Sequence, residues 1–160
     1  MSETKLAGRM FGVAMALVIM HGGANAQMAQ QVGEAKWGPA PPMLPAGAQI
    51  SVVSGDPGKS APYTVRLKFP AGYAIPAHSH PTDENVVVVS GAFIVGMGDK
   101  LDKTAGTALT PGGISQLTAG MNHFAYTKQP TTIILYGIGP VDLKYVNPKD
   151  DPRNSMTKKP

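Results

Sequence analysis

The chain has 160 residues, of which 42% are hydrophobic and 15% are charged, and it contains no cysteine. This length suits a single domain, and the composition is that of a globular protein rather than a disordered or fibrous one. The absence of cysteine excludes disulfides, thiolate metal sites and cysteine nucleophiles. The net charge is +4, but the basic residues are scattered and form no stripe, so nucleic-acid binding is not expected.

Residues 1–26 have the features of a secretory signal peptide. Lys5 and Arg9 precede an apolar run of eleven residues, Met10–Met20, and the small residues Ala24 and Ala26 mark a cleavage site. The apolar run is shorter than the roughly 20 residues that span a bilayer. We therefore expect cleavage after residue 26 and a secreted, periplasmic protein without a membrane anchor.

Residues 27–49 contain closely spaced prolines, which prevent a continuous helix: Pro39, Pro41, Pro42 and Pro45. We predict an extended arm whose Trp37 and Leu44 pack on the body of a domain. The sequence leaves open whether that body belongs to the same subunit.

Short strands are predicted over residues 50–147. Apolar and polar side chains alternate over Tyr63–Phe69, which indicates a half-buried strand, and four consecutive valines in Glu84–Ser90 predict a strand buried on both faces or nearly so. Other predicted strands are Ile50–Val53, Ala92–Met97, Thr107–Leu109, Ile114–Leu117, His123–Thr127, Thr131–Ile138 and Leu143–Val146. Many short strands separated by turns are typical of an all-β jelly roll or barrel. Residues 148–160 should form a loose polar tail.

Three histidines and one glutamate are the candidate metal ligands. His78 and His80 are two residues apart on an extended segment, so their rings project from the same face. Glu84 begins the valine-rich strand and His123 begins a later strand, so folding can bring both to the same point. Three imidazoles and a carboxylate suit Fe, Mn, Ni, Cu or Zn and leave room for water or substrate.

Glycines complete the pattern around these residues. The chain contains Gly72-x5-His78-x-His80-x3-Glu84-x6-Gly91, followed by Gly112-x5-Thr118-x-Gly120-x2-His123-x3-Thr127. The first motif resembles that of the cupin family at every fixed position. In the second motif, Thr118 replaces the family's proline and Thr127 replaces its asparagine.

The cupin resemblance covers about residues 60–140 and implies a fold, a cofactor and an assembly. The implied fold is a single jelly roll, or double-stranded β-helix barrel. It implies that one divalent transition metal is bound by His78, His80, Glu84 and His123. It also implies a homodimer, in which the arm around Trp37 is a candidate for exchange between subunits.

The resemblance leaves the reaction open, because one fold supports many functions. The first hypothesis is a metal-dependent dioxygenase that acts on a small organic molecule, with Glu84 as a ligand or as the general base. The second is a non-oxidative metal-dependent lyase or isomerase. The third is a non-enzymatic protein that binds a metal or a small molecule.

Overall fold

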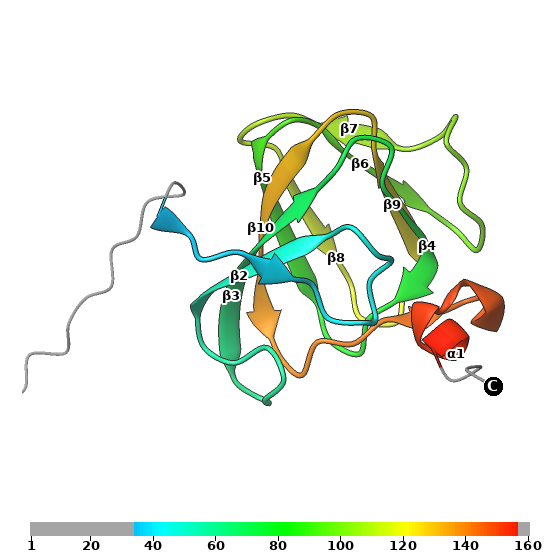
Figure 1. Ribbon diagram of the computed structural model, residues 1–160. Helices are drawn as coiled ribbons and strands as arrows, with labels where there is room; N and C mark the ends of the chain where they lie inside the picture. The colour runs from blue at the N-terminus through cyan, green and yellow to red at the C-terminus, as the bar shows by residue number, and fades with distance from the viewer. Residues whose placement is uncertain (1–33, 157–160) are drawn as a thin grey trace, which may run out of the picture.

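The computed structural model describes residues 34–156 and shows two antiparallel sheets (Figure 1). The predicted signal peptide lies outside the described residues. One sheet has the order β1-β2-β3-β10-β5-β8 and the other β11-β4-β9-β6-β7. The strands of the first sheet are β1 (Gly38–Pro39), β2 (Gln49–Ser54), β3 (Pro62–Phe69), β5 (Glu84–Ser90), β8 (Ile114–Leu117) and β10 (Thr131–Ile138). Those of the second are β4 (Ala74–Ser79), β6 (Phe93–Met97), β7 (Thr107–Leu109), β9 (His123–Thr127) and β11 (Lys144–Tyr145).

The two sheets face each other and enclose one main hydrophobic core. Alternate side chains of each strand point into this core because successive residues of a strand project to opposite faces. Val65 of β3, Val86 of β5 and Ile133 of β10 are each at most 1% exposed. These features confirm the predicted all-β jelly roll.

The valine-rich strand β5 is fully buried on one face only. Val86 and Val88 are buried, whereas Val87 and Val89 on the opposite face are half-buried. The sequence predicted burial, or near burial, of both faces. Full burial of the valines is found only on the face that carries Glu84.

Strand β4 is absent from the strands predicted by sequence. It contains Pro76, which lacks the N–H group that a regular strand position uses. The structure places Pro76 where the register between β4 and β9 shifts, between Ile75 and His78. The irregularity accommodates the proline and lets the strand continue to Ser79.

The predicted arm packs on the barrel of its own chain. Residues 40–48 form a loop closed by a hydrogen bond from Ala40 N to Ala48 O, and Leu44 is buried in the core. Two tyrosine hydroxyls attach the loop to the barrel: Tyr73 donates to Pro45 O at 2.5 Å, and Tyr145 donates to Met43 O at 2.7 Å. Trp37 lies on β3, where the Lys68 ammonium is 4.1 Å from its ring centroid.

The described part of the polar tail is folded, contrary to the expectation of a loose segment. It contains a 3₁₀ turn at Pro148–Asp150 and the short helix α1 (Pro152–Met156). Asn147 caps the turn by accepting a hydrogen bond from Lys149 N. Arg153 then joins the tail to the segment before β11, which gives this polar sequence a fixed position. No helix in residues 34–156 is long and apolar enough to cross a membrane.

We predict that two glycines of the motif respond differently to substitution. Gly72 and Gly91 both have a positive φ, of 75° and 81°, so alanine at either position strains the backbone by about 1–2 kcal/mol. An alanine Cβ at Gly91 would also clash with Pro130 O and Thr131, whereas nothing lies within 4 Å of one at Gly72. Gly91→Ala should therefore lower the free energy of unfolding by about 1–3 kcal/mol more than Gly72→Ala in urea denaturation. Equal losses would contradict the close approach at Gly91.

Candidate metal centre

The three predicted histidines meet at one end of the barrel. His78 in β4 is the direct cross-strand partner of His123 in β9, and His80 follows β4 on the same face as His78. One ring nitrogen from each of the three residues lies within 4.8 Å of the other two, close enough for one metal ion. All three side chains are buried, with exposed fractions of 1–6%. The structure thus brings together three of the four predicted ligands as a compact group.

Each imidazole is oriented by a main-chain carbonyl. His78 Nδ1 is 2.7 Å from Pro76 O, His123 Nδ1 is 3.0 Å from Met121 O, and His80 Nδ1 is 2.9 Å from Asp142 O. A carbonyl oxygen only accepts hydrogen bonds, so each Nδ1 must carry the hydrogen. In the neutral rings, the lone pairs on Nε2 are then available to a metal. This partnership between ring and carbonyl is the usual way in which metal-binding histidines are fixed.

Burial keeps two of the imidazoles neutral. Loss of solvation, with His123 and His80 nearby, lowers the pKa of His78 to about 3. Burial also lowers the pKa of His123. Both rings are therefore uncharged at neutral pH, which is the form that binds metals.

The fourth predicted ligand, Glu84, lies beside the imidazole group rather than within it. Its Oε1 is 3.3 Å from His80 Nε2, and its side chain is 12% exposed. Burial by itself lowers the pKa of His80, but the facing Glu84 carboxylate and Asp142 together outweigh burial and raise it above its ordinary value.

The donor set fits a cation. His80 Nε2 is buried and has no hydrogen-bond partner of good geometry, although Glu84 is within ion-pair distance. When Nδ1 carries the ring hydrogen, the Nε2 lone pair faces a negative oxygen, and a positive charge between them removes the repulsion. A proton or a metal ion can supply that charge.

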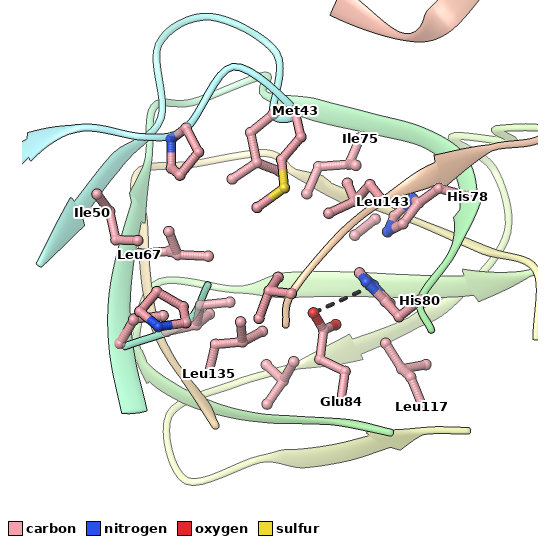
Figure 2. Close-up of a pocket in the computed structure, with 18 of the residues that line it drawn as sticks. Met43, Ile50, Leu67, Ile75, His78, His80, Glu84, Leu117, Leu135 and Leu143 are labelled. Atoms are coloured by element: carbon pink, nitrogen blue, oxygen red, sulfur yellow. Dashed lines mark ion pairs between the residues drawn. The ribbon is translucent and has the colours of Figure 1, made fainter. Parts of the chain in front are cut away.

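An apolar cavity extends from the imidazoles through the barrel. Figure 2 shows Leu67, Leu135 and Ile50 opposite His80 and Glu84, at the far side of the cavity. The cavity has about 670 Å³ of empty space including its mouth. The arm contributes part of the wall through Pro41, Met43 and Leu44. A small molecule in this space would lie directly against the imidazole group.

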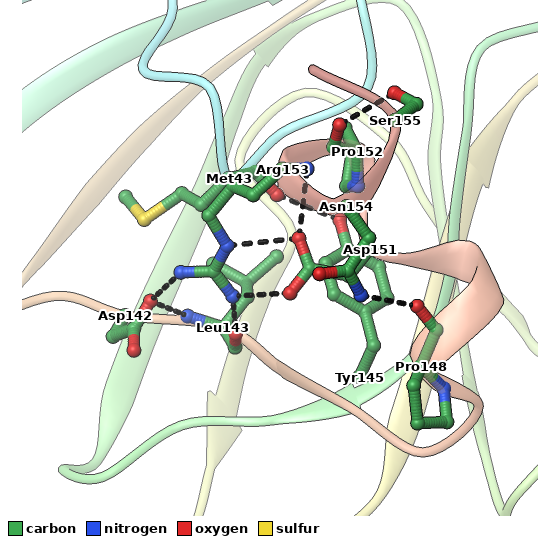
Figure 3. A network of polar contacts seen from close by, with 10 residues as sticks. All are labelled: Met43, Asp142, Leu143, Tyr145, Pro148, Asp151, Pro152, Arg153, Asn154 and Ser155. Carbon is green, nitrogen blue, oxygen red and sulfur yellow. Dashed lines mark hydrogen bonds and ion pairs between the residues drawn. The ribbon is translucent and has the colours of Figure 1, made fainter. Parts of the chain in front are cut away.

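The C-terminal segment supports His80 through Asp142. Figure 3 shows the contacts of Arg153 with Asp142, Leu143 and Asp151. The Arg153 guanidinium donates to Asp142 Oδ1 and to Leu143 O, both at 2.7 Å, and it also pairs with Asp151. It therefore holds the Asp142–Leu143 peptide, whose Asp142 carbonyl accepts from His80 Nδ1. Sequence analysis missed this support because Asp142 is 62 residues from His80 and acts through its main chain.

The comparisons with known proteins point to the same fold. A family model described as the ChrR Cupin-like domain matches residues 25–141. No curated protein is significantly similar to the chain.

Several solved structures share the architecture at low identity. A putative acetylacetone dioxygenase from Methylibium petroleiphilum PM1 has a TM-score of 0.59 and 20% identity, covering 79% of this chain and 85% of that one. An acetylacetone dioxygenase from Acinetobacter johnsonii has a TM-score of 0.60 and 15% identity, covering 80% and 83%. An RmlC-like cupin from Ralstonia eutropha JMP134 has a TM-score of 0.58 and 20% identity, covering 82% and 83%. At these identities the likeness establishes the fold alone.

We predict that Arg153→Gln weakens metal binding at a distance. The substitution frees the Asp142 carbonyl to move and so loosens His80. We expect a measurable loss of zinc affinity, smaller than the roughly 10–100-fold loss typical when a direct partner of a ligand is removed. Competition with a chelating dye measures the affinity.

The control for Arg153 is Lys59→Gln, which removes the cation of an exposed ion pair with Asp56. This variant should bind zinc as the wild type does. If Arg153→Gln also bound zinc like the wild type, the supporting role of Arg153 would be wrong.

Proposed function

The chain belongs to the ChrR cupin-like domain family, and from this premise we propose that it is a metal-dependent enzyme of the dioxygenase type that acts on a small organic molecule. The observation that carries the proposal is the group of three buried imidazoles, each fixed with its hydrogen on Nδ1, at the end of an apolar cavity. Burying three imidazoles in an apolar interior is unfavourable unless their nitrogens have partners, and a bound metal ion would be such a partner.

His78, His80 and His123 are the residues that we propose hold one divalent transition metal. Imidazole nitrogens suit Fe, Mn, Ni, Cu and Zn, and three protein ligands leave positions open for other molecules. Such a metal supplies a Lewis acid and, for iron, copper or manganese, a redox centre.

Glu84 has two proposed roles that its position supports. With its carboxylate 3.3 Å from His80 Nε2, a small rotation would add it to the ligand set. If it remains outside, it is the nearest carboxylate able to take a proton from a molecule in the cavity, which is the role of a general base. The surrounding apolar wall would exclude water from that transfer.

A dioxygenase reaction is favoured over the alternatives by the apolar surroundings of the centre and by structural relatives. Two of the structures that share the fold are named as acetylacetone dioxygenases, one of them putative. The same residues would also serve a non-oxidative lyase or isomerase, or a protein that only binds a metal or small molecule. We further propose that the protein is exported after cleavage at residue 26 and that it acts as a homodimer.

The metal proposal predicts about one transition-metal ion per chain. The protein should be produced without a histidine tag, with metals measured by elemental mass spectrometry before and after reconstitution. His78→Ala and His123→Ala should each lose the metal, and circular dichroism should confirm that they remain folded. If Glu84 is a ligand, Glu84→Gln should bind the metal more weakly, whereas the neighbouring Asp83→Asn should bind it as the wild type does. A folded wild-type protein that takes up no metal would remove the basis of the proposal.

The dioxygenase proposal predicts oxygen consumption that depends on substrate. Both atoms of O₂ enter the product, so O₂ and substrate should disappear in equal amounts. We would use 2,4-pentanedione and larger 1,3-diketones with an oxygen electrode, and follow products by mass spectrometry with ¹⁸O₂. If Glu84 is the general base, Glu84→Gln should lower turnover by about 10²–10⁴-fold while keeping its metal. Product formed equally well without O₂ would instead favour a lyase or isomerase.

A further inference from the structure

The cavity beside the imidazole group is polar at one end only. Seventeen of its 22 lining residues are apolar, and the other five are the three histidines, Glu84 and Tyr63. No lysine or arginine lines it among the described residues. The basic side chains that give the chain its net positive charge therefore do not line the cavity.

This distribution restricts which molecules fit. A charged or strongly polar group placed among Leu67, Leu135 and Ile133 would lose its water and find no partner, which is unfavourable. A hydrocarbon group in the same place gains from leaving water. Oxygen atoms of a ligand are therefore tolerated only next to the imidazole group.

Tyr63 carries the one hydroxyl group in the cavity wall. Its side chain is 4% exposed, and among the described residues the structure gives its hydroxyl no hydrogen-bond partner. A tyrosine hydroxyl with no partner in the protein is free to donate a hydrogen bond to a ligand atom in the cavity. Burial, together with the nearby Glu84, raises the pKa of Tyr63, which keeps the group protonated as a donor.

The sheet places this hydroxyl at the polar end. Gly137 of β10 pairs with Tyr63 of β3 on one side and with Glu84 of β5 on the other. The Tyr63 hydroxyl is 3.5 Å from where a Cβ of residue 137 would lie. Because glycine has no side chain there, the phenol can lie across β10 on the same face as Glu84.

We propose that the cavity binds a small molecule whose oxygen atoms lie at one end and whose remainder is hydrocarbon, and that Tyr63 donates a hydrogen bond to that oxygen-bearing end. This inference rests on the proposed function in that the oxygen-bearing end would lie at the metal. The inference goes beyond the proposed function in two ways. It excludes sugars, dicarboxylates and amino acids as ligands, and it assigns Tyr63 as a residue that determines ligand specificity.

Three probes with the same head group and similarly shaped tails test the tail preference: 4-methylpentanoate, succinamate and succinate. Their tails end in an isopropyl, an amide and a carboxylate group. We expect 4-methylpentanoate to bind at least about tenfold more tightly than the other two, because only its tail loses no hydrogen bonds in the cavity. Binding is measured by NMR on zinc-loaded and on metal-free protein labelled at its methionine methyl groups, since Met43 lines the cavity. Succinate binding as tightly as 4-methylpentanoate would overturn the inference.

Tyr63→Phe tests the hydrogen bond. It should weaken 4-methylpentanoate by at least about threefold but change binding of 2-methylpentane, which lacks the oxygen atoms, by less than twofold. Equal loss for both probes would show that Tyr63 only shapes the wall, and no loss for either would show that it does not contact the ligand. Both results contradict its proposed role.

The matched control is Tyr126→Phe, because the Tyr126 hydroxyl donates to Lys103 O and Ala105 O outside the cavity. This variant should bind every probe as the wild type does. If the protein binds no zinc, the proposed function fails, and the order of affinities in metal-free protein still decides the tail preference. If zinc binds but the order is reversed, only the present inference fails.

Discussion

Three hydrogen bonds from imidazole Nδ1 atoms to main-chain carbonyls connect the candidate metal centre to the rest of the barrel. Polar nitrogens cannot be buried in an apolar interior without partners, and the carbonyls satisfy one nitrogen of each ring. Two of the carbonyls, of Pro76 and Met121, come from residues two positions before the histidine. The third belongs to Asp142 and depends on the C-terminal segment being in place. The geometry of the site is therefore partly local and partly a product of the complete fold.

The same end of the barrel is closed by segments from both ends of the described chain. Tyr145 in β11 donates to Met43 O in the arm, and Arg153 in α1 holds the segment before β11. These contacts are polar and lie around an apolar cavity wall. Because the exposed ion pairs contribute little stability individually, their main effect is to fix position. The arm thus helps to shape the cavity, and the tail supports His80. Neither segment contains a candidate ligand.

Short apolar segments bounded by turn residues were sufficient to predict most strands. The expected segments Glu84–Ser90, His123–Thr127 and Thr131–Ile138 coincide with β5, β9 and β10. Strand β4 was missed because Pro76 is unfavourable in a regular strand, and only the irregular pairing with β9 makes it acceptable. The helix in the tail was missed for a related reason. Its short polar sequence has little tendency to fold alone, and contacts made by Arg153 with distant residues fix its position.

The sequence by itself determined the fold class and the identity of the three clustered imidazoles. Residues two apart on a strand share a face, so His78 and His80 had to point the same way. Tertiary structure alone decided that Glu84 lies beside the imidazole group, that Asp142 orients His80, and that Tyr63 belongs to the cavity. These features depend on register and on contacts between segments up to 62 residues apart. Local side-chain periodicity contains no information about such distances, because it describes each strand but not its neighbours.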